Sequence, residues 1–176
     1  MEPLKPIRKV RSIIYPPNVR WKCVRCTMCC GDTPQRRRII RALRVEVEEI
    51  AKKTGRQVED FAFLLHKSEP YSYAIRKRQD GKCLFLVGNS CGIYLSRPLT
   101  CRFYPFSVNK HSTQTYEFQV TEEECPGLGH GEKIGRNSFV KLLKIAEKRL
   151  SHREKGTTQS LQVARPRGYS TISAPR

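Results

Sequence analysis

Residues 21–34 read WKCVRCTMCCGDTP, and this cysteine-dense stretch decides the fold of the chain. Cys23, Cys26, Cys29 and Cys30 follow the spacing C-x2-C-x2-C-C, and glycine, aspartate and proline then close the segment as a loop. Spacers of two residues let successive thiolates converge on one centre, and the amides of the same loop can donate hydrogen bonds to the sulfurs. The stretch therefore predicts a metal site.

Further cysteines at wider intervals complete the predicted donor set. A tetrahedral zinc ion or a cubane cluster takes four protein thiolates, so the 8 cysteines of the chain suffice for two full sites, or for one site with spare thiols. Adjacent side chains point in different directions, so we place Cys29 and Cys30 in different sets. The two predicted sets of metal ligands are Cys23, Cys26, Cys29 with Cys125, and Cys30, Cys83, Cys91 with Cys101.

The spacing also bears on the kind of metal. The first three cysteines have the spacing of the bacterial ferredoxin run, and Cys125-Pro126 matches its closing Cys-Pro, which favours an iron-sulfur cluster of the 4Fe-4S type. Zinc is the alternative, although zinc ribbons show a second C-x2-C knuckle that is missing here. A disulfide framework is typical of secreted proteins, and the charged, proline-broken N-terminus does not read as a secretory signal. We therefore expect a cytoplasmic metal-binding protein.

Composition places limits on the size of the core. A chain of 176 residues predicts one domain, and its 38% hydrophobic residues predict a thin core to which bound metal adds folding free energy. No apolar run is long enough to predict a transmembrane helix. The domain should therefore depend on metal binding for part of its stability.

The formal net charge of +18 is concentrated towards the two ends of the chain and in the arginine-rich segment 36–44. We expect residues 1–20 to form a basic extended arm, 21–150 a cysteine-cluster metal-binding domain, and 151–176 a basic disordered tail. A positive field attracts polyanions. The predicted partners are therefore a redox partner or an acidic protein, and also nucleic acid, which the basic arms would contact. The charge is equally compatible with a role in solubility alone.

Periodicity predicts a small α+β domain, irregular and cysteine-rich, with short antiparallel strands and about three helices. The predicted helices are a helix that starts at Arg44 and stops at Gly55, a short helix over 59–65, and a long amphipathic helix over 137–150. The predicted strands are 37–43, a hairpin of 71–77 with 83–87 around the turn 79–81, and 115–121.

Four motifs together resemble a known family: C-x2-C-x2-C-C, GKCLFL at 81–86, CGIYLSRPLTCRFYPF at 91–106, and ECPGLGHG at 124–131. They are similar to those of the CxxCxxCC zinc- or iron-chelating cysteine-cluster proteins, which include YkgJ-like proteins and the flagellin lysine N-methylase (FliB) proteins. The resemblance covers about residues 21–150 and includes all eight cysteines, Arg97, Pro98, Arg102 and Pro105. It implies iron-sulfur or zinc binding.

Two further groups of residues have alternative interpretations. Arg97 and Arg102 are candidate cofactor-binding residues that donate hydrogen bonds to cluster sulfides or balance thiolate charge, or they cap carbonyls in a compact turn. The glycine-rich segment 127–131 either cradles an anion or forms a tight turn that positions Cys125.

Three functions stay open from the sequence. The first is an iron-sulfur protein with a redox, electron-transfer or maturation role. The second is a zinc-stabilised module that binds RNA or an acidic partner. The third is a protein lysine N-methylase or a methylase accessory, which rests on the resemblance alone, because the chain shows no Rossmann-like βαβ unit.

Overall fold

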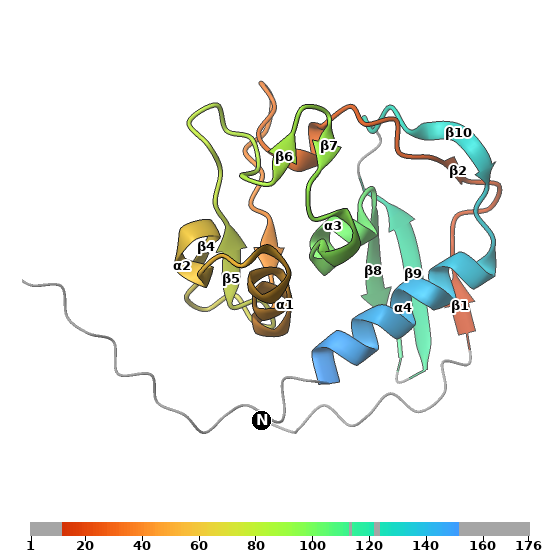
Figure 1. Ribbon diagram of the computed structural model, residues 1–176. Helices are drawn as coiled ribbons and strands as arrows, with labels where there is room; N and C mark the ends of the chain where they lie inside the picture. The colour runs from red at the N-terminus through yellow and green to blue at the C-terminus, as the bar shows by residue number, and fades with distance from the viewer. Residues whose placement is uncertain (1–11, 113, 122–123, 152–176) are drawn as a thin grey trace, which may run out of the picture.

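The structure is a computed structural model that describes residues 12–112, 114–121 and 124–151. Its elements form two regions, each around its own hydrophobic core, as Figure 1 shows. We call them the α1 region, with core residues between Ile40 and Ile93, and the α4 region, with core residues Ile13 and Phe106 to Leu143.

The α4 region is a three-stranded sheet covered by one helix. The strands β1 (Ser12–Ile14), β9 (Thr115–Val120) and β8 (Phe106–Lys110) lie in the order β1-β9-β8. Helix α4 (Arg136–Ser151) crosses this sheet in Figure 1, and its Phe139 is fully buried against Phe118 and Phe106. The apolar residues of α4 recur at helical spacing, so one face of the helix can bury them together. The predictions of this helix and of strand 115–121 are confirmed.

The α1 region is built from shorter elements. Helix α1 (Arg44–Thr54) ends as predicted at Gly55, whose φ of 68° is the left-handed conformation that glycine adopts without steric cost. Beside it lie helix α2 (Val58–Phe61) and a three-stranded sheet of order β3-β5-β4. These strands are β3 (Arg41–Ala42), β5 (Tyr73–Ile75) and β4 (Ala62–Leu64).

Two short strand pairs at one end of the molecule carry or adjoin cysteines. Strands β6 (Leu86–Val87) and β7 (Ser90–Cys91) form one pair, and β2 (Arg20–Trp21) with β10 (Leu128–Lys133) forms the other. Both pairs lie at the top of Figure 1. The remaining elements are the 3-10 turns η1 (Met28–Cys30) and η2 (Tyr94–Ser96) and helix α3 (Leu99–Phe103).

Two predicted elements are wrong in detail. The helix expected over 59–65 ends at Phe61, because the next three residues pair with β5 as strand β4. The turn after Arg78 forms, since the Arg78 amide donates to the Lys82 carbonyl at 2.8 Å. Its flanks pair as predicted through one antiparallel bridge, Lys77 with Cys83, and a hydrogen bond from the Leu84 amide to the Arg76 carbonyl at 3.1 Å, but they form no longer ladder. Strand β5 pairs with β3 and β4 instead, and the Cys83 amide donates to the Cys30 carbonyl at 2.6 Å. The hairpin is thus shorter than predicted, because β5 and Cys83 also pair with other segments.

The predicted fold class, a small α+β domain, is confirmed. Within the described residues there are four α-helices rather than about three, and the β1–β9 pairing is parallel whereas the other strand pairs are antiparallel. Residues 12–14 of the predicted arm belong to the sheet as β1, and the predicted tail from residue 152 lies outside the described residues. In the described chain no helix has the length and apolar character needed to cross a membrane.

Candidate metal centre

All eight cysteines line one cavity of about 690 Å³, and all eight are free thiols. The thiols come from the η1 loop, from the Cys83 segment, from β7, from α3 and from the turn before β10. Much of the remaining wall is apolar and includes Ile40, Ile75 and Ile93. The cysteines predicted from spacing as metal ligands therefore do gather, although they lie up to 102 residues apart (125 − 23) in the chain.

The cysteine loop docks on the Cys83 segment by a close backbone approach at Gly31. Its φ of 153° lies in the range that side chains disfavour, and a Cβ at this position would stand 2.5 Å from the Gly81 carbonyl oxygen. The Asp32 amide donates to the same carbonyl at 3.0 Å. Glycine at position 31 is thus required to bring the end of the loop onto the Cys83 segment.

The Asp32 carboxylate holds the loop from its other side. It accepts hydrogen bonds from the Arg38 backbone amide at 2.8 Å and from Lys77 Nζ at 2.6 and 2.7 Å. Lys77 first, and then the Arg38 amide, hold the pKa of the Asp32 carboxyl below its usual value. The carboxylate therefore stays charged and joins the cysteine loop to the segment after β5.

Gly127 makes a similar close approach on the other side of the cavity. The Lys22 amide donates to the Gly127 carbonyl at 3.1 Å, and a Cβ on Gly127 would stand 2.4 Å from the Lys22 carbonyl oxygen. The glycine-rich segment continues as β10 against β2, and Cys125, just before it, lines the same cavity as Cys23. This geometry agrees with the tight-turn interpretation, and anion binding by the segment stays a prediction.

Five of the thiols are electrostatically linked. Cys29 Sγ lies 3.7 Å from Cys30 Sγ, and this hydrogen bond, followed by burial, raises the pKa of Cys29. Burial raises the pKa of Cys101 to about 12, with a further increase from the neighbouring thiols Cys83, Cys29 and Cys91. Burial also raises the pKa of Cys83 and the pKa of Cys91, and the charge of Cys29 raises both further. A cation among these thiols would relieve both effects, because it compensates the thiolate charge.

The donor set fits a thiolate-bound metal or cluster, because thiolates are the soft ligands that zinc and iron-sulfur centres take. In the described parts of the chain no three Cys, His, Asp or Glu side chains already stand in an arrangement that would hold a metal ion. Bringing four of these thiolates onto one metal couples metal binding to ordering of the site.

Comparison with known proteins agrees with this thiol-lined cavity. Residues 22–126, which contain all eight cysteines, match the CxxCxxCC family, described as "Putative zinc- or iron-chelating domain". The chain belongs to this family. This chain is also 26% identical over 170 residues to an uncharacterized protein of Methanocaldococcus jannaschii, and the match covers 91% of this chain and 86% of the relative. No solved structure matches this chain significantly.

Arg38 is a residue of this CxxCxxCC protein that the sequence analysis did not single out. Its guanidinium lies 4.8 Å from the centre of the Tyr104 ring, and its Nη2 donates to the Thr100 carbonyl at 3.4 Å. Against the larger effect of burial, its positive charge lowers the pKa of Cys29 and Cys101. In the sequence Arg38 is one of several neighbouring arginines, and no spacing rule distinguishes it.

The two arginines predicted to bind the cofactor lie in different places. Arg97 lines the cavity, stacks 3.8 Å from the Tyr94 ring centre and donates to the Tyr94 carbonyl at 2.7 Å. Arg102 is not among the cavity-lining residues; its guanidinium donates to the carbonyls of Arg97 and Leu95. These bonds fit the carbonyl-capping role, and cofactor contact by either arginine stays a prediction.

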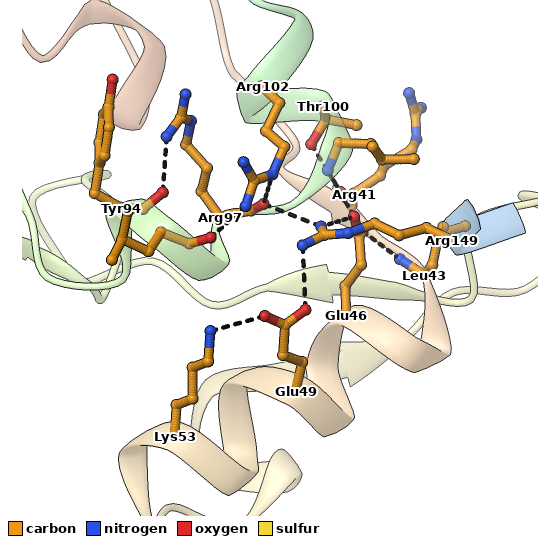
Figure 2. A network of polar contacts seen from close by, with 12 residues as sticks. Arg41, Leu43, Glu46, Glu49, Lys53, Tyr94, Arg97, Thr100, Arg102 and Arg149 are labelled. Atoms are coloured by element: carbon orange, nitrogen blue, oxygen red, sulfur yellow. Dashed lines mark hydrogen bonds and ion pairs between the residues drawn. The ribbon is translucent and has the colours of Figure 1, made fainter. Parts of the chain in front are cut away.

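A buried ion pair connects the cavity wall to both regions, as Figure 2 shows. The fully buried Glu46 of α1 accepts from Arg149 Nη1 at 2.6 Å, from the Leu99 amide at 2.7 Å and from the Leu43 amide at 2.9 Å. Arg149 of α4 also donates to the Arg97 carbonyl at 3.2 Å. Glu46 therefore fixes the start of α3, the helix that carries Cys101. In the sequence, only a negative charge near the start of a helix distinguishes Glu46, and this position does not indicate burial.

Proposed function

We propose that this CxxCxxCC protein is a cytoplasmic iron-sulfur protein that holds 4Fe-4S clusters and has a redox, electron-transfer or maturation role. The observation that carries the proposal is the single cavity of about 690 Å³ lined by eight thiols. A zinc ion and a cubane each take four thiolates, but a cubane also contributes its own irons and sulfides and therefore fills more of this space. The apolar wall would keep water from the cluster, which tunes its potential.

The electrostatic links among the thiols support a definite division of the ligands. Cys29 has its strongest link with Cys30, whose Sγ lies 3.7 Å away, and weaker links with Cys83, Cys91 and Cys101. Since one centre takes four thiolates and we place the adjacent Cys29 and Cys30 in different sets, we assign Cys29, Cys83, Cys91 and Cys101 to one centre. The second centre takes the remaining four, which also line the cavity: Cys23, Cys26, Cys30 and Cys125. Compared with the division predicted from spacing, Cys29 and Cys30 are exchanged.

Anaerobic purification followed by iron, acid-labile sulfide and zinc analysis tests the proposal. We expect iron and sulfide in matching amounts with broad visible absorbance. Stoichiometric zinc without colour would contradict it and would make the chain a zinc-stabilised module.

Double substitutions test the division of the ligands. If Cys29 and Cys83 serve one centre, Cys29→Ser with Cys83→Ser loses no more iron than Cys83→Ser alone, because the same centre is lost in both. Cys29→Ser with Cys23→Ser should lose both centres. If instead Cys29→Ser with Cys23→Ser loses no more iron than Cys23→Ser alone, Cys29 shares a centre with Cys23. That result would restore the division predicted from spacing.

The surroundings of the cavity support an acidic redox protein as partner. Neither of the segments 3–31 and 81–116, which carry most of the cavity wall, contains an aspartate or glutamate. Val24 and Tyr94 line the cavity yet are 44% and 48% exposed, and the basic side chains Arg25 and Arg97 line it beside them. The charged side chains that line the cavity are all basic, and such a wall is complementary to an acidic partner.

Reduction of the iron-loaded protein by an acidic flavodoxin at varied salt tests this partner. We expect the rate to fall with ionic strength, and the charge reversal Arg25→Glu to slow it at low salt only. The reversal Arg44→Glu, at an exposed arginine away from the cavity wall, is the matched control. Equal rates for both variants would count against docking at the cavity.

A further inference from the structure

The wall of the cavity contains one buried polar atom without a partner, the indole nitrogen of Trp21. Trp21 Nε1 is buried, and the described residues offer it no hydrogen-bond acceptor. A buried N–H that has lost its water and gained no acceptor costs free energy, so such a group commonly marks a missing partner. The indole N–H is therefore a hydrogen-bond donor without an acceptor among the described residues, in a side chain that lines the thiol cavity.

The backbone around Trp21 holds the indole in place. Trp21 pairs with Leu128 across the β2–β10 ladder, and its ring meets the Phe106 ring edge-on at a centroid distance of 6.4 Å. A Cβ on Gly127 would stand 3.0 Å from Trp21 Nε1, so the glycine leaves room for the indole nitrogen at the cavity wall. The packing thus orients the N–H before any acceptor is bound.

The position of Trp21 in the chain indicates which thiols its acceptor belongs to. Cys23 follows it by two residues, and Gly127 in turn follows Cys125 by two residues. All four residues line the same cavity, and no carboxylate or imidazole is among its lining side chains. The thiolate sulfurs are therefore the negatively charged acceptors that this wall can supply.

We propose that the Trp21 indole N–H donates a hydrogen bond to a sulfur of the metal centre held by Cys23, Cys26 and Cys125. The inference rests on the metal centre of the proposed function and assigns Trp21 a positioning and tuning role. A hydrogen bond to a thiolate or sulfide withdraws electron density from the sulfur and stabilises the reduced cluster. Trp21 thereby sets the potential of one centre and leaves the other unaffected.

Because the chain has a single tryptophan, one indole N–H signal in an NMR spectrum of ¹⁵N-labelled protein reports this bond directly. The signal is recorded for the metal-free chain and for the chain loaded with Zn²⁺, a diamagnetic probe for thiolate sites. We expect the indole proton to move downfield and to exchange more slowly with solvent after loading. In Cys125→Ser the shift should be lost, whereas Cys83→Ser, in the other proposed centre, should retain it.

The second readout is the reduction potential of the iron-loaded protein. Trp21→Phe keeps an aromatic ring and removes the N–H, so we expect unchanged iron content and a more negative potential for one centre. Tyr116→Phe, which removes another buried group without a partner among the described residues but lies outside the cavity wall, is the control and should leave both potentials unchanged.

The outcomes separate this inference from the proposed function. The role of Trp21 would be overturned if the indole signal does not change in a chain shown to contain bound zinc. It would also be overturned if Trp21→Phe has the same reduction potential as the unaltered protein. Iron-sulfur binding would stand in both cases. Zinc in place of iron with a shifted indole signal would overturn the iron-sulfur function and leave the hydrogen bond supported. A chain that takes up neither metal would overturn both.

Discussion

The α4 region and the α1 region achieve order by different means. The α4 region has strands of up to six residues and a helix of 16 residues around a cluster of aromatic rings. The α1 region and the cysteine segments packed on it have strands of two or three residues, and their chain path depends on close backbone approaches such as that at Gly31. Apolar packing can stabilise the first by itself, whereas the second leaves thiols around a cavity and gains stability when metal binds.

Phe139→Ala is the largest expected change and breaks the α4 region. Phe139 is fully buried, and its ring lies 4.6 Å from Phe118, 5.2 Å from Tyr15 and 5.4 Å from Phe106 between centroids. Its removal leaves a cavity that should lower the free energy of unfolding by about 4 kcal/mol. Denaturant unfolding measures this effect, and the exposed Lys141→Ala in the same helix serves as control. A loss below about 1 kcal/mol would show that the aromatic cluster does not stabilise this region.

Glu46→Gln tests the contact between the two regions. The substitution leaves the Arg149 guanidinium, only 11% exposed, without its nearest carboxylate, at an expected cost of about 3 kcal/mol. Because α1, α3 and α4 meet at this pair, hydrogen exchange should accelerate in both regions. Glu48→Gln, at an exposed site of α1, should change stability by less than about 0.5 kcal/mol. If exchange accelerates in α1 alone, the pair does not couple the regions.

Gly31→Ala should affect the α1 region only. The new Cβ would meet the Gly81 carbonyl, so the cysteine loop must move away from the Cys83 segment, at a cost of about 2 kcal/mol. We expect weaker metal retention, measured by competition with a chelator. Gly55→Ala is the matched control, because Gly55 also has positive φ but no atom within 4 Å of an added Cβ. Equal metal retention in the two variants would assign the effect to backbone strain and not to the close approach.

Arg38→Gln has the smallest expected effect, which is measured at the thiols. Removing the charge that lowers the pKa of Cys29 and Cys101 raises both values, so protons compete more strongly with the metal. Metal affinity near neutral pH should fall by about tenfold, as measured by chelator competition. The exposed Arg37→Gln should leave it unchanged. Equal affinities for both variants would show that total charge, and not the position of Arg38, matters.

Sequence analysis was most successful where a pattern is local. Helices α1 and α4 and strand β9 were predicted because their apolar residues recur with the period of one element. Strand β4 was mistaken for part of a helix, because its pairing with β5 overrides the local preference of a short apolar run. The same limit applies to β1, whose partner β9 lies about a hundred residues away in the chain.

By itself, the sequence determined the family, the set of eight thiols and the main helices, since cysteine spacing and apolar periodicity are properties of neighbouring residues. Only the tertiary structure decided that all eight thiols share one cavity and that Arg38 acts on two of them. It alone also shows that Glu46 is buried on Arg149 and that the Trp21 indole has no acceptor among the described residues. These features depend on contacts between segments far apart in the chain, and such contacts arise from packing and desolvation, which leave no periodic signal in the sequence.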